Sequence, residues 1–215
     1  DGGVTFSHFG AELVPVGEPV PASFFISALE WGGGRIWAYA PNLGLFYSEN
    51  NGSSFLPSEL LVDVDLDDPE AGSDMPVLVN NITVNPSFPD HVLVAMNFNG
   101  VFQTFDAGDS WSNTYGDLHV SRPDSLLGLW SKTASSVMVD PDDINVLIAG
   151  FKNRGIYRTA NGGINWTLVG EDQRPENLSS LVNYSFVISD APSGEYYCQI
   201  DGWSVLVSND EGLTW

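Results

Sequence analysis

Four aspartates of this sequence are spaced nearly as metal ligands are. They stand at Asp63, Asp65, Asp67 and Asp74, which are positions 1, 3, 5 and 12 of one acidic segment. Oxygen ligands at this spacing are typical of a Ca²⁺ loop. The sixth position holds Asp68, where such loops carry glycine. The segment is therefore interpreted either as a Ca²⁺ site or as a solvated acidic loop, and no other cofactor is required.

Groups that could do catalysis do not form a recognisable set. The three histidines, His8, His91 and His119, are far apart and lack metal-ligand spacing. The single cysteine, Cys198, lies in an alternating run and is interpreted as an unreactive thiol in a strand, not as a nucleophile. Asp140, at the end of an apolar run, is expected to form a turn. No catalytic residue is identifiable from these patterns.

Two tryptophans are candidates for ligand binding. Trp31 and Trp130 fall near the expected edges of the repeated units or in insertions. An exposed indole there could stack on a sugar ring, and packing within the fold is the alternative.

The overall charge limits the partners. The formal net charge is −21, from 28 acidic and 7 basic side chains. Such a chain repels a nucleic-acid backbone, so nucleic acid is not an expected partner. No apolar run approaches the roughly 20 residues that cross a bilayer, so no membrane span is expected.

One eight-residue pattern recurs along the chain: Ser/Thr, any residue, Asp/Asn, any residue, Gly, any residue, Ser/Thr/Asn, aromatic. Its third positions are residues 1, 50, 106, 161 and 210, so one unit spans about fifty residues, as a four-stranded propeller blade does. The first copy starts at the third position. The residues that define the copies are Asp1, Gly3, Ser48, Asn50, Gly52, Phe55, Thr104, Asp106, Gly108, Trp111, Thr159, Asn161, Gly163, Trp166, Ser208, Asp210, Gly212 and Trp215.

The chemistry of the pattern is local. The Asp or Asn oxygen can accept hydrogen bonds from nearby backbone N–H groups and so close a turn. Glycine permits a conformation that a Cβ would hinder. The hydroxyl can tie the turn to the strand, and the aromatic ring can enter the core between sheets. We therefore expect a stabilising role and not catalysis.

The repeated pattern resembles the Asp-box, or bacterial neuraminidase repeat, over nearly the whole chain. This resemblance implies a β-propeller like those of sialidases, xyloglucanase-type glycosidases, sortilin-type receptors and photosystem assembly factors. It also implies that each box joins the third and fourth strands of a blade, on the periphery. The arginine and carboxylate signatures of the enzymes in these families are not visible here.

The expected fold is all-β, a propeller of four-stranded antiparallel blades with four blades visible. Alternating runs divide the chain into blades separated by insertions. The predicted segments are 1–23 (end of a preceding blade and linker), 24–60 (blade), 61–81 (acidic insertion), 82–118 (blade), 119–135 (insertion), 136–172 (blade) and 184–215 (incomplete blade).

The sequence starts and stops within copies of the pattern. Either residues 4–9 supply the missing outer strand and close a four-bladed ring, or the chain is an arc of a ring of six to ten blades. We favour the arc, in which further blades of the same parent chain would be partners.

Two functions remain open. The first is a binding or scaffold module, extracellular or on the cell surface, for protein or glycan partners. The second is part of a glycoside hydrolase, sialidase-like or xyloglucanase-like, with catalytic residues partly outside this chain. The absence of visible catalytic signatures favours the first.

Overall fold

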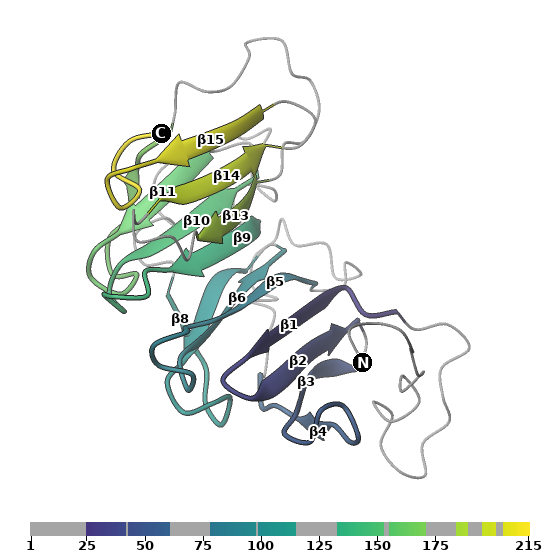
Figure 1. Ribbon diagram of the computed structural model, residues 1–215. Coiled ribbons are helices and arrows are strands. Elements are labelled where there is room, and N and C mark those ends of the chain that lie inside the picture. The colour runs from purple at the N-terminus through teal and green to yellow at the C-terminus, as the bar shows by residue number, and fades with distance from the viewer. Residues whose placement is uncertain are drawn as a thin grey trace, which may run out of the picture.

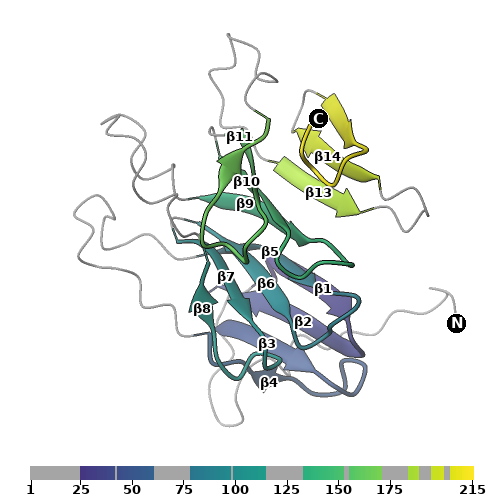
Figure 2. The ribbon, with the colours of Figure 1, turned by 90° about the vertical axis from the view of Figure 1, so that its left-hand side faces the viewer.

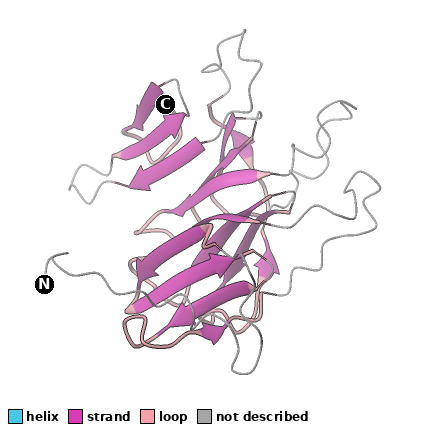
Figure 3. Ribbon diagram, turned by 90° about the vertical axis from the view of Figure 1, so that its right-hand side faces the viewer, coloured by secondary structure: helices cyan, strands magenta, loops and turns pink. Residues whose placement is uncertain are grey.

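The computed structural model describes residues 25–41, 43–60, 78–97, 99–114, 133–152, 155–170, 184–188, 195–200 and 204–215. These residues form strands, turns and loops, with no helix among them (Figure 3). In this part of the chain no helix is long and apolar enough to cross a membrane.

The strands form four antiparallel sheets in which hydrogen-bonded neighbours follow chain order. The first sheet is β1 (Ala28–Gly32), β2 (Arg35–Ala40), β3 (Gly44–Ser48) and β4 (Leu56–Pro57). The second is β5 (Val79–Val84), β6 (Val92–Met96), β7 (Gly100–Thr104) and β8 (Ser112–Asn113). The third is β9 (Ala134–Val139), β10 (Leu147–Phe151), β11 (Gly155–Thr159) and β12 (Thr167–Leu168). The fourth has three described strands, β13 (Tyr184–Ile188), β14 (Tyr196–Ile200) and β15 (Ser204–Ser208).

The sheets follow one another along an arc, and their first strands form its inner side. β1 contacts β5, β5 contacts β9 and β9 contacts β13. In Figure 1 the first and fourth sheets stand at opposite ends of the series. Figure 2 shows the second sheet with β5 to β8 in sequence order and the short β8 at its outer edge. Meandering sheets that meet through their first strands are the blades of a β-propeller.

The core lies between the sheets, because each middle strand is covered on both faces. All five residues of β6 are buried. Val92, Val94 and Met96 pack with the first sheet, whereas Leu93 and Ala95 pack with the third. A continuous apolar run thus becomes a strand buried on two sides, as in other stacked sheets.

The apolar run at 24–29 predicts a first strand for the blade at 24–60, whereas the described strand begins at Ala28. β1 covers Ala28–Gly32 and pairs with β2 up to Gly32 opposite Arg35. Gly33 and Gly34 make the two-residue hairpin turn with φ of 60° and 79°, conformations that suit glycine. The strand therefore runs to the hairpin, and Trp31 lies one residue before its end, on the inner edge strand of the sheet.

Candidate functional site

The repeated turn follows β3, β7, β11 and β15, and three of its hydrogen bonds are the same in every described copy. In the copy after β7, the Thr104 hydroxyl donates to Asp106 Oδ1 at 2.6 Å and accepts the Gly108 amide at 3.0 Å. Asp106 Oδ1 also accepts the Ser110 amide at 2.8 Å. The equivalent bonds in the other copies start from Ser48, Thr159 and Ser208. The turn is closed by its own side chains.

Two adjacent residues at the fourth and fifth positions of the turn have left-handed backbones. Ala107 and Gly108 have φ of 59° and 95°, and the other described copies have the same pair. A Cβ on Gly163 would lie 2.2 Å from the Thr114 carbonyl oxygen, in the outer edge of the preceding sheet. The fifth position therefore needs glycine both for its φ and for close contact with the neighbouring sheet.

The carbonyl at the fourth position accepts a hydrogen bond from the preceding sheet at all three junctions. Arg35 Nη1 donates to Ala107 O at 3.1 Å. Gln103 Nε2 donates to Gly162 O at 3.2 Å, and Arg158 Nε donates to Glu211 O at 2.8 Å. Sequence reasoning missed these contacts, because the donors, two arginines and one glutamine, lie more than fifty residues before their acceptors.

The turn carboxylates have lowered pKa values. Hydrogen bonds from the Ser110 hydroxyl and then the Thr104 hydroxyl hold the pKa of Asp106 at about 2, below its ordinary 3.8. The Thr214 hydroxyl and amide, then the Ser208 hydroxyl, lower the pKa of Asp210 in the same way. Both groups accept hydrogen bonds while charged, which favours the ionised form.

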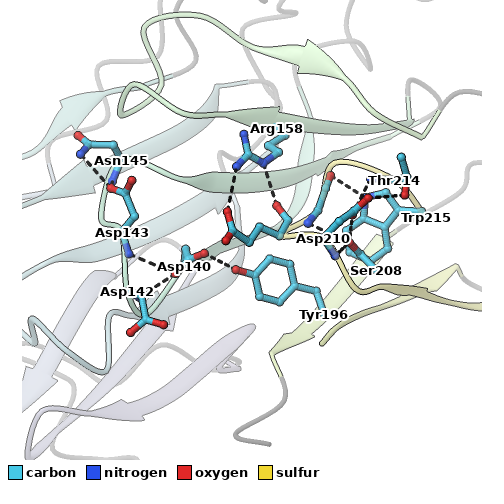
Figure 4. A network of polar contacts seen from close by, with 12 residues as sticks. Asp140, Asp142, Asp143, Asn145, Arg158, Tyr196, Ser208, Asp210, Thr214 and Trp215 are labelled. Carbon is cyan, nitrogen blue, oxygen red and sulfur yellow. Dashed lines mark hydrogen bonds and ion pairs between the residues drawn. The ribbon is translucent and has the colours of Figure 1, made fainter. Parts of the chain in front are cut away.

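A second polar network spans the third junction (Figure 4). Asp140, buried at the end of β9, accepts the Asp142 amide at 2.7 Å and the Asp143 amide at 3.2 Å through Oδ1. Its Oδ2 accepts the hydroxyl of Tyr196 from the fourth sheet. Burial, and then this bond to Asp140, raises the pKa of Tyr196. Asp140 is thus engaged in closing a turn and linking two sheets.

The second sheet uses neutral groups at the equivalent place. Asn85 Oδ1 accepts the amides of Ser87 and Phe88 at 2.9 and 3.1 Å. Its Nδ2 lies 3.3 Å from His91 Nδ1, and His91 Nε2 lies 3.1 Å from Gln103 Oε1. Burial lowers the pKa of His91. A neutral His91 that donates from Nε2 satisfies both contacts and connects the turn to Gln103.

A cleft of about 330 Å³ opens beside the turn of the third sheet. It is lined by a guanidinium, hydroxyls and amides together with aliphatic side chains. Its residues include Arg158, Asn161, Asn165, Thr167, Val169 and Leu213. At the first two junctions Ser58 and Thr114 follow the outer strand and donate to turn carbonyls, whereas Val169 stands at that place here. Its volume lies at the lower end of the range for small-molecule sites, and its lining contains no aromatic side chain.

The residues predicted as sites fall in different places. Trp31 lies on β1 with 67% of its surface exposed. Trp130, the acidic residues Asp63, Asp65, Asp67 and Asp74, and the first turn residues Asp1 and Gly3 lie outside the described residues. Among the residues that the structure does describe, no three His, Cys, Asp or Glu side chains group as metal ligands would.

Comparisons with known proteins support the fold. Scans of protein-family models and of curated proteins find no match. Among solved structures, an ancestral GH74 enzyme matches with a TM-score of 0.62 at 18% identity, covering 88% of this chain and 23% of its own. The GH74 xyloglucanase from Xanthomonas campestris matches with a TM-score of 0.55 at 12% identity, covering 85% of this chain and 29% of its own.

A third structure comes from a two component system. The extracellular domain assigned to a hybrid two component system of B. thetaiotaomicron matches with a TM-score of 0.55 at 15% identity, covering 85% of this chain and 21% of its own. The chain thus spans less than a third of each of these proteins. Likeness at this identity shows the fold alone, an all-β arrangement of propeller blades.

Proposed function

We propose that the chain is a binding module of an extracellular or surface-exposed β-propeller, and that the cleft at the third junction receives a glycan or a polar segment of a partner protein. The observation that carries this proposal is the lining of the cleft. Arg158 and Thr167 offer hydrogen-bonding groups, and Val169 and Leu213 offer apolar surface. Sugars are recognised by this combination of polar groups and an apolar wall.

We propose that the repeated turns are Asp-boxes, which stabilise the blades of this module. Their hydrogen bonds stay within the turn or reach the preceding sheet, as with Arg158 Nε and Glu211 O at 2.8 Å. They would hold the arc rigid, and the turn that contains Thr159, Asn161 and Asn165 would also form one wall of the cleft.

The test uses a matched pair of variants. Thr167 and Ser112 are the first residues of β12 and β8, and both are exposed. Thr167→Trp fills the cleft. Ser112→Trp places an indole at the equivalent position of the second sheet, and Ser112 does not line the cleft. Glycan arrays followed by calorimetry should find a ligand whose affinity falls at least about tenfold in T167W and is kept in S112W. Equal affinity in both variants, or no glycan or protein ligand at all, overturns the proposal.

A second function, hydrolysis of a glycosidic bond, is favoured by one carboxyl group. Burial raises the pKa of Glu30, which lies half-buried on the innermost strand β1. A raised pKa suits a general acid, and a glycosidase needs a second carboxyl opposite it. That partner would come from outside the described residues. Turnover of chromogenic glycosides that Glu30→Gln abolishes, in a variant that melts like the parent, would establish hydrolysis over simple binding.

A further inference from the structure

The cleft at the third junction can be compared with the same place at the other two junctions, because the turn and the outer strand recur in one register. In the third sheet Thr167 pairs with Arg158. In the second sheet Ser112 pairs with Gln103 in the same way, and β4 pairs with β3 alike in the first. Each residue that lines the cleft therefore has an equivalent at the first and second junctions.

The charge of these equivalent residues differs from junction to junction. At the first junction, Glu49 stands at the second turn position and Asp109 at the sixth position of the following turn. At the second junction, Asp106 stands at the third turn position, and no equivalent place holds lysine or arginine. At the third junction, Arg158 is the one charged residue among the described residues that line the cleft. The lining is therefore positive, in a chain of net charge −21.

The guanidinium of Arg158 keeps donors that its own fold does not use. Nε donates to Glu211 O at 2.8 Å (Figure 4). Nη2 lies 3.9 Å from the Glu211 carboxylate, too far for a hydrogen bond, and neither Nη atom donates to any other described residue. Arg35, in contrast, donates from Nε and Nη2 to Glu49 at 3.0 and 2.5 Å and from Nη1 to Ala107 O at 3.1 Å.

The burial of Arg158 makes an additional acceptor favourable. Its side chain is only 12% exposed, so the Nη groups are largely withdrawn from water. Charged donors that lose water without gaining an acceptor cost free energy. An anionic group in the cleft would supply that acceptor.

The rest of the lining offers no aromatic surface. Val169 and Leu213 are aliphatic, and Ala160 stands in the third sheet where the second sheet has Phe105. A sugar in this cleft therefore has no ring to stack on. Charge-assisted hydrogen bonds, roughly twice as strong as neutral ones, are then the main source of affinity that the lining provides.

We propose that the ligand of the cleft is an acidic glycan, and that the Nη groups of Arg158 bind the carboxylate of one of its uronic acid residues. The inference rests on the proposed function, because it names the kind of glycan that the cleft would bind. A guanidinium offers two parallel N–H donors that match the two oxygens of a carboxylate. Thr167, exposed and opposite Arg158 in the register, offers a hydroxyl to the sugar.

The acidity of the whole chain does not prevent this contact. At physiological salt, screening limits the field of distant carboxylates to about 8 Å. The carboxylate that competes for Arg158 is that of Glu211, 3.9 Å from Nη2 and 69% exposed. Removing the charge of Glu211 should therefore strengthen the binding of an acidic ligand.

The first test varies the ligand. Calorimetry compares oligosaccharides of galacturonate, glucuronate and mannuronate, each beside the neutral oligosaccharide obtained by reducing its carboxyl groups. At least one oligouronate should bind at least about tenfold more tightly than its reduced form. An oligoglutamate peptide carries the same carboxylates on another backbone and should bind more weakly. Equal affinity for an oligouronate and its reduced form, or tighter binding of the peptide, overturns the proposal.

The second test places a charge in the cleft. T167E puts a carboxylate opposite Arg158, whereas T167Q puts a neutral side chain of the same size there. T167E should bind the oligouronate at least about tenfold more weakly than T167Q. S112E is the control, because Ser112 is the equivalent position of the second sheet and does not line the cleft, and it should keep the parent affinity. Equal affinities of T167E and T167Q would overturn the contact with Arg158.

A third variant gives a gain that a merely structural role would not produce. E211Q removes the competing carboxylate and keeps the backbone carbonyl that positions Arg158. It should bind the oligouronate about twofold more tightly or better. Weaker or unchanged binding in E211Q would contradict a carboxylate at the Nη groups.

The outcomes separate this inference from the proposed function. A neutral glycan that binds the parent chain as tightly as any oligouronate, and whose binding is lost in T167W, would overturn the acidic ligand and leave the cleft as a glycan site. If no glycan of either kind binds, both fall.

Discussion

Arg158 Nε donates to the backbone carbonyl of Glu211 at 2.8 Å, across the junction of the third and fourth sheets. The Glu211 carboxylate lies farther away, 3.9 Å from Nη2. The acceptor that positions Arg158 is therefore a peptide group held in the left-handed conformation by the turn, with φ of 56°. Because Arg158 donates to a backbone carbonyl, this hydrogen bond depends on the conformation of the turn and not on the side chain at position 211.

Replacing Arg158 should therefore destabilise the fold, and replacing Glu211 should not. R158M removes the donor and keeps a side chain of similar length, and should lower the free energy of unfolding by about 1–2 kcal/mol. E211Q keeps the carbonyl and removes an exposed ion pair, and should cost less than about 0.5 kcal/mol. Urea denaturation followed by tryptophan fluorescence measures both. Equal losses in the two variants would mean that the ion pair, and not the carbonyl, is the contact that counts.

The turn could be predicted from sequence, and the junctions could not. The side-chain hydrogen bonds that close the turn from Thr104 to Trp111 lie within eight residues, so the residue types suffice to specify them. The junction donors are Arg35 on β2, Gln103 on β7 and Arg158 on β11. No spacing or residue type is common to the three, because each needs only an N–H within reach of a carbonyl that the fold has already positioned.

The limits of a strand were harder to predict where local composition and strand pairing indicate different residues. The apolar run at 24–29 indicates a strand, yet β1 begins at Ala28 and ends at Gly32. Pairing with β2 through the hairpin at Gly33 and Gly34 sets the register, and tertiary pairing overrides local composition. The exposure of Trp31 was also inaccessible to sequence reasoning, because it depends on which sheet has no neighbour in the described structure.

The close approach of the turns to the preceding sheets predicts different costs for two glycines of similar backbone. Gly163 and Gly34 have φ of 90° and 79°. A Cβ on Gly163 would meet the Thr114 carbonyl oxygen at 2.2 Å, whereas a Cβ on Gly34 would meet nothing within 4 Å. G34A should cost about 1 kcal/mol, for backbone strain alone. G163A should cost about 2–4 kcal/mol, because overpacking adds to the strain.

Thermal and urea unfolding of the two alanine variants give the comparison directly. Since both substitutions remove the same glycine entropy from the unfolded chain, the difference between them isolates the contact with Thr114. Equal destabilisation would contradict tight packing of the turn on the second sheet.

The bond between Tyr196 and Asp140 should couple the third and fourth sheets. Y196F leaves the buried Asp140 carboxylate without its hydroxyl donor and should cost about 1–3 kcal/mol. In a double-mutant cycle with D140N, the coupling energy should exceed about 0.5 kcal/mol. Y197F is the matched control, because the Tyr197 hydroxyl donates to Glu195 on the surface at 2.8 Å. Additive losses in the cycle would show that the two groups act independently.

The turn carboxylates should make the free energy of unfolding depend on pH over a narrow range. The pKa of Asp106 is about 2 in the folded chain and 3.8 ordinarily, so the unfolded chain takes up the proton first as the pH falls. The stabilisation from Asp106 is therefore complete above about pH 4 and is lost as the pH falls toward 2. Asp210, with its pKa lowered by the same kind of bonds, should behave alike.

Asparagine stands at the same turn position in Asn50 and Asn161, so D106N and D210N preserve the turn and remove the titration. The difference in unfolding free energy between the parent and the double variant D106N/D210N, measured by urea denaturation from pH 2 to 6, should be constant above pH 4. Below that it should shift in favour of the variant, because only the parent loses charged acceptors at these sites. A difference that stays flat to pH 2 would mean that the hydroxyl donors do not favour the ionised form.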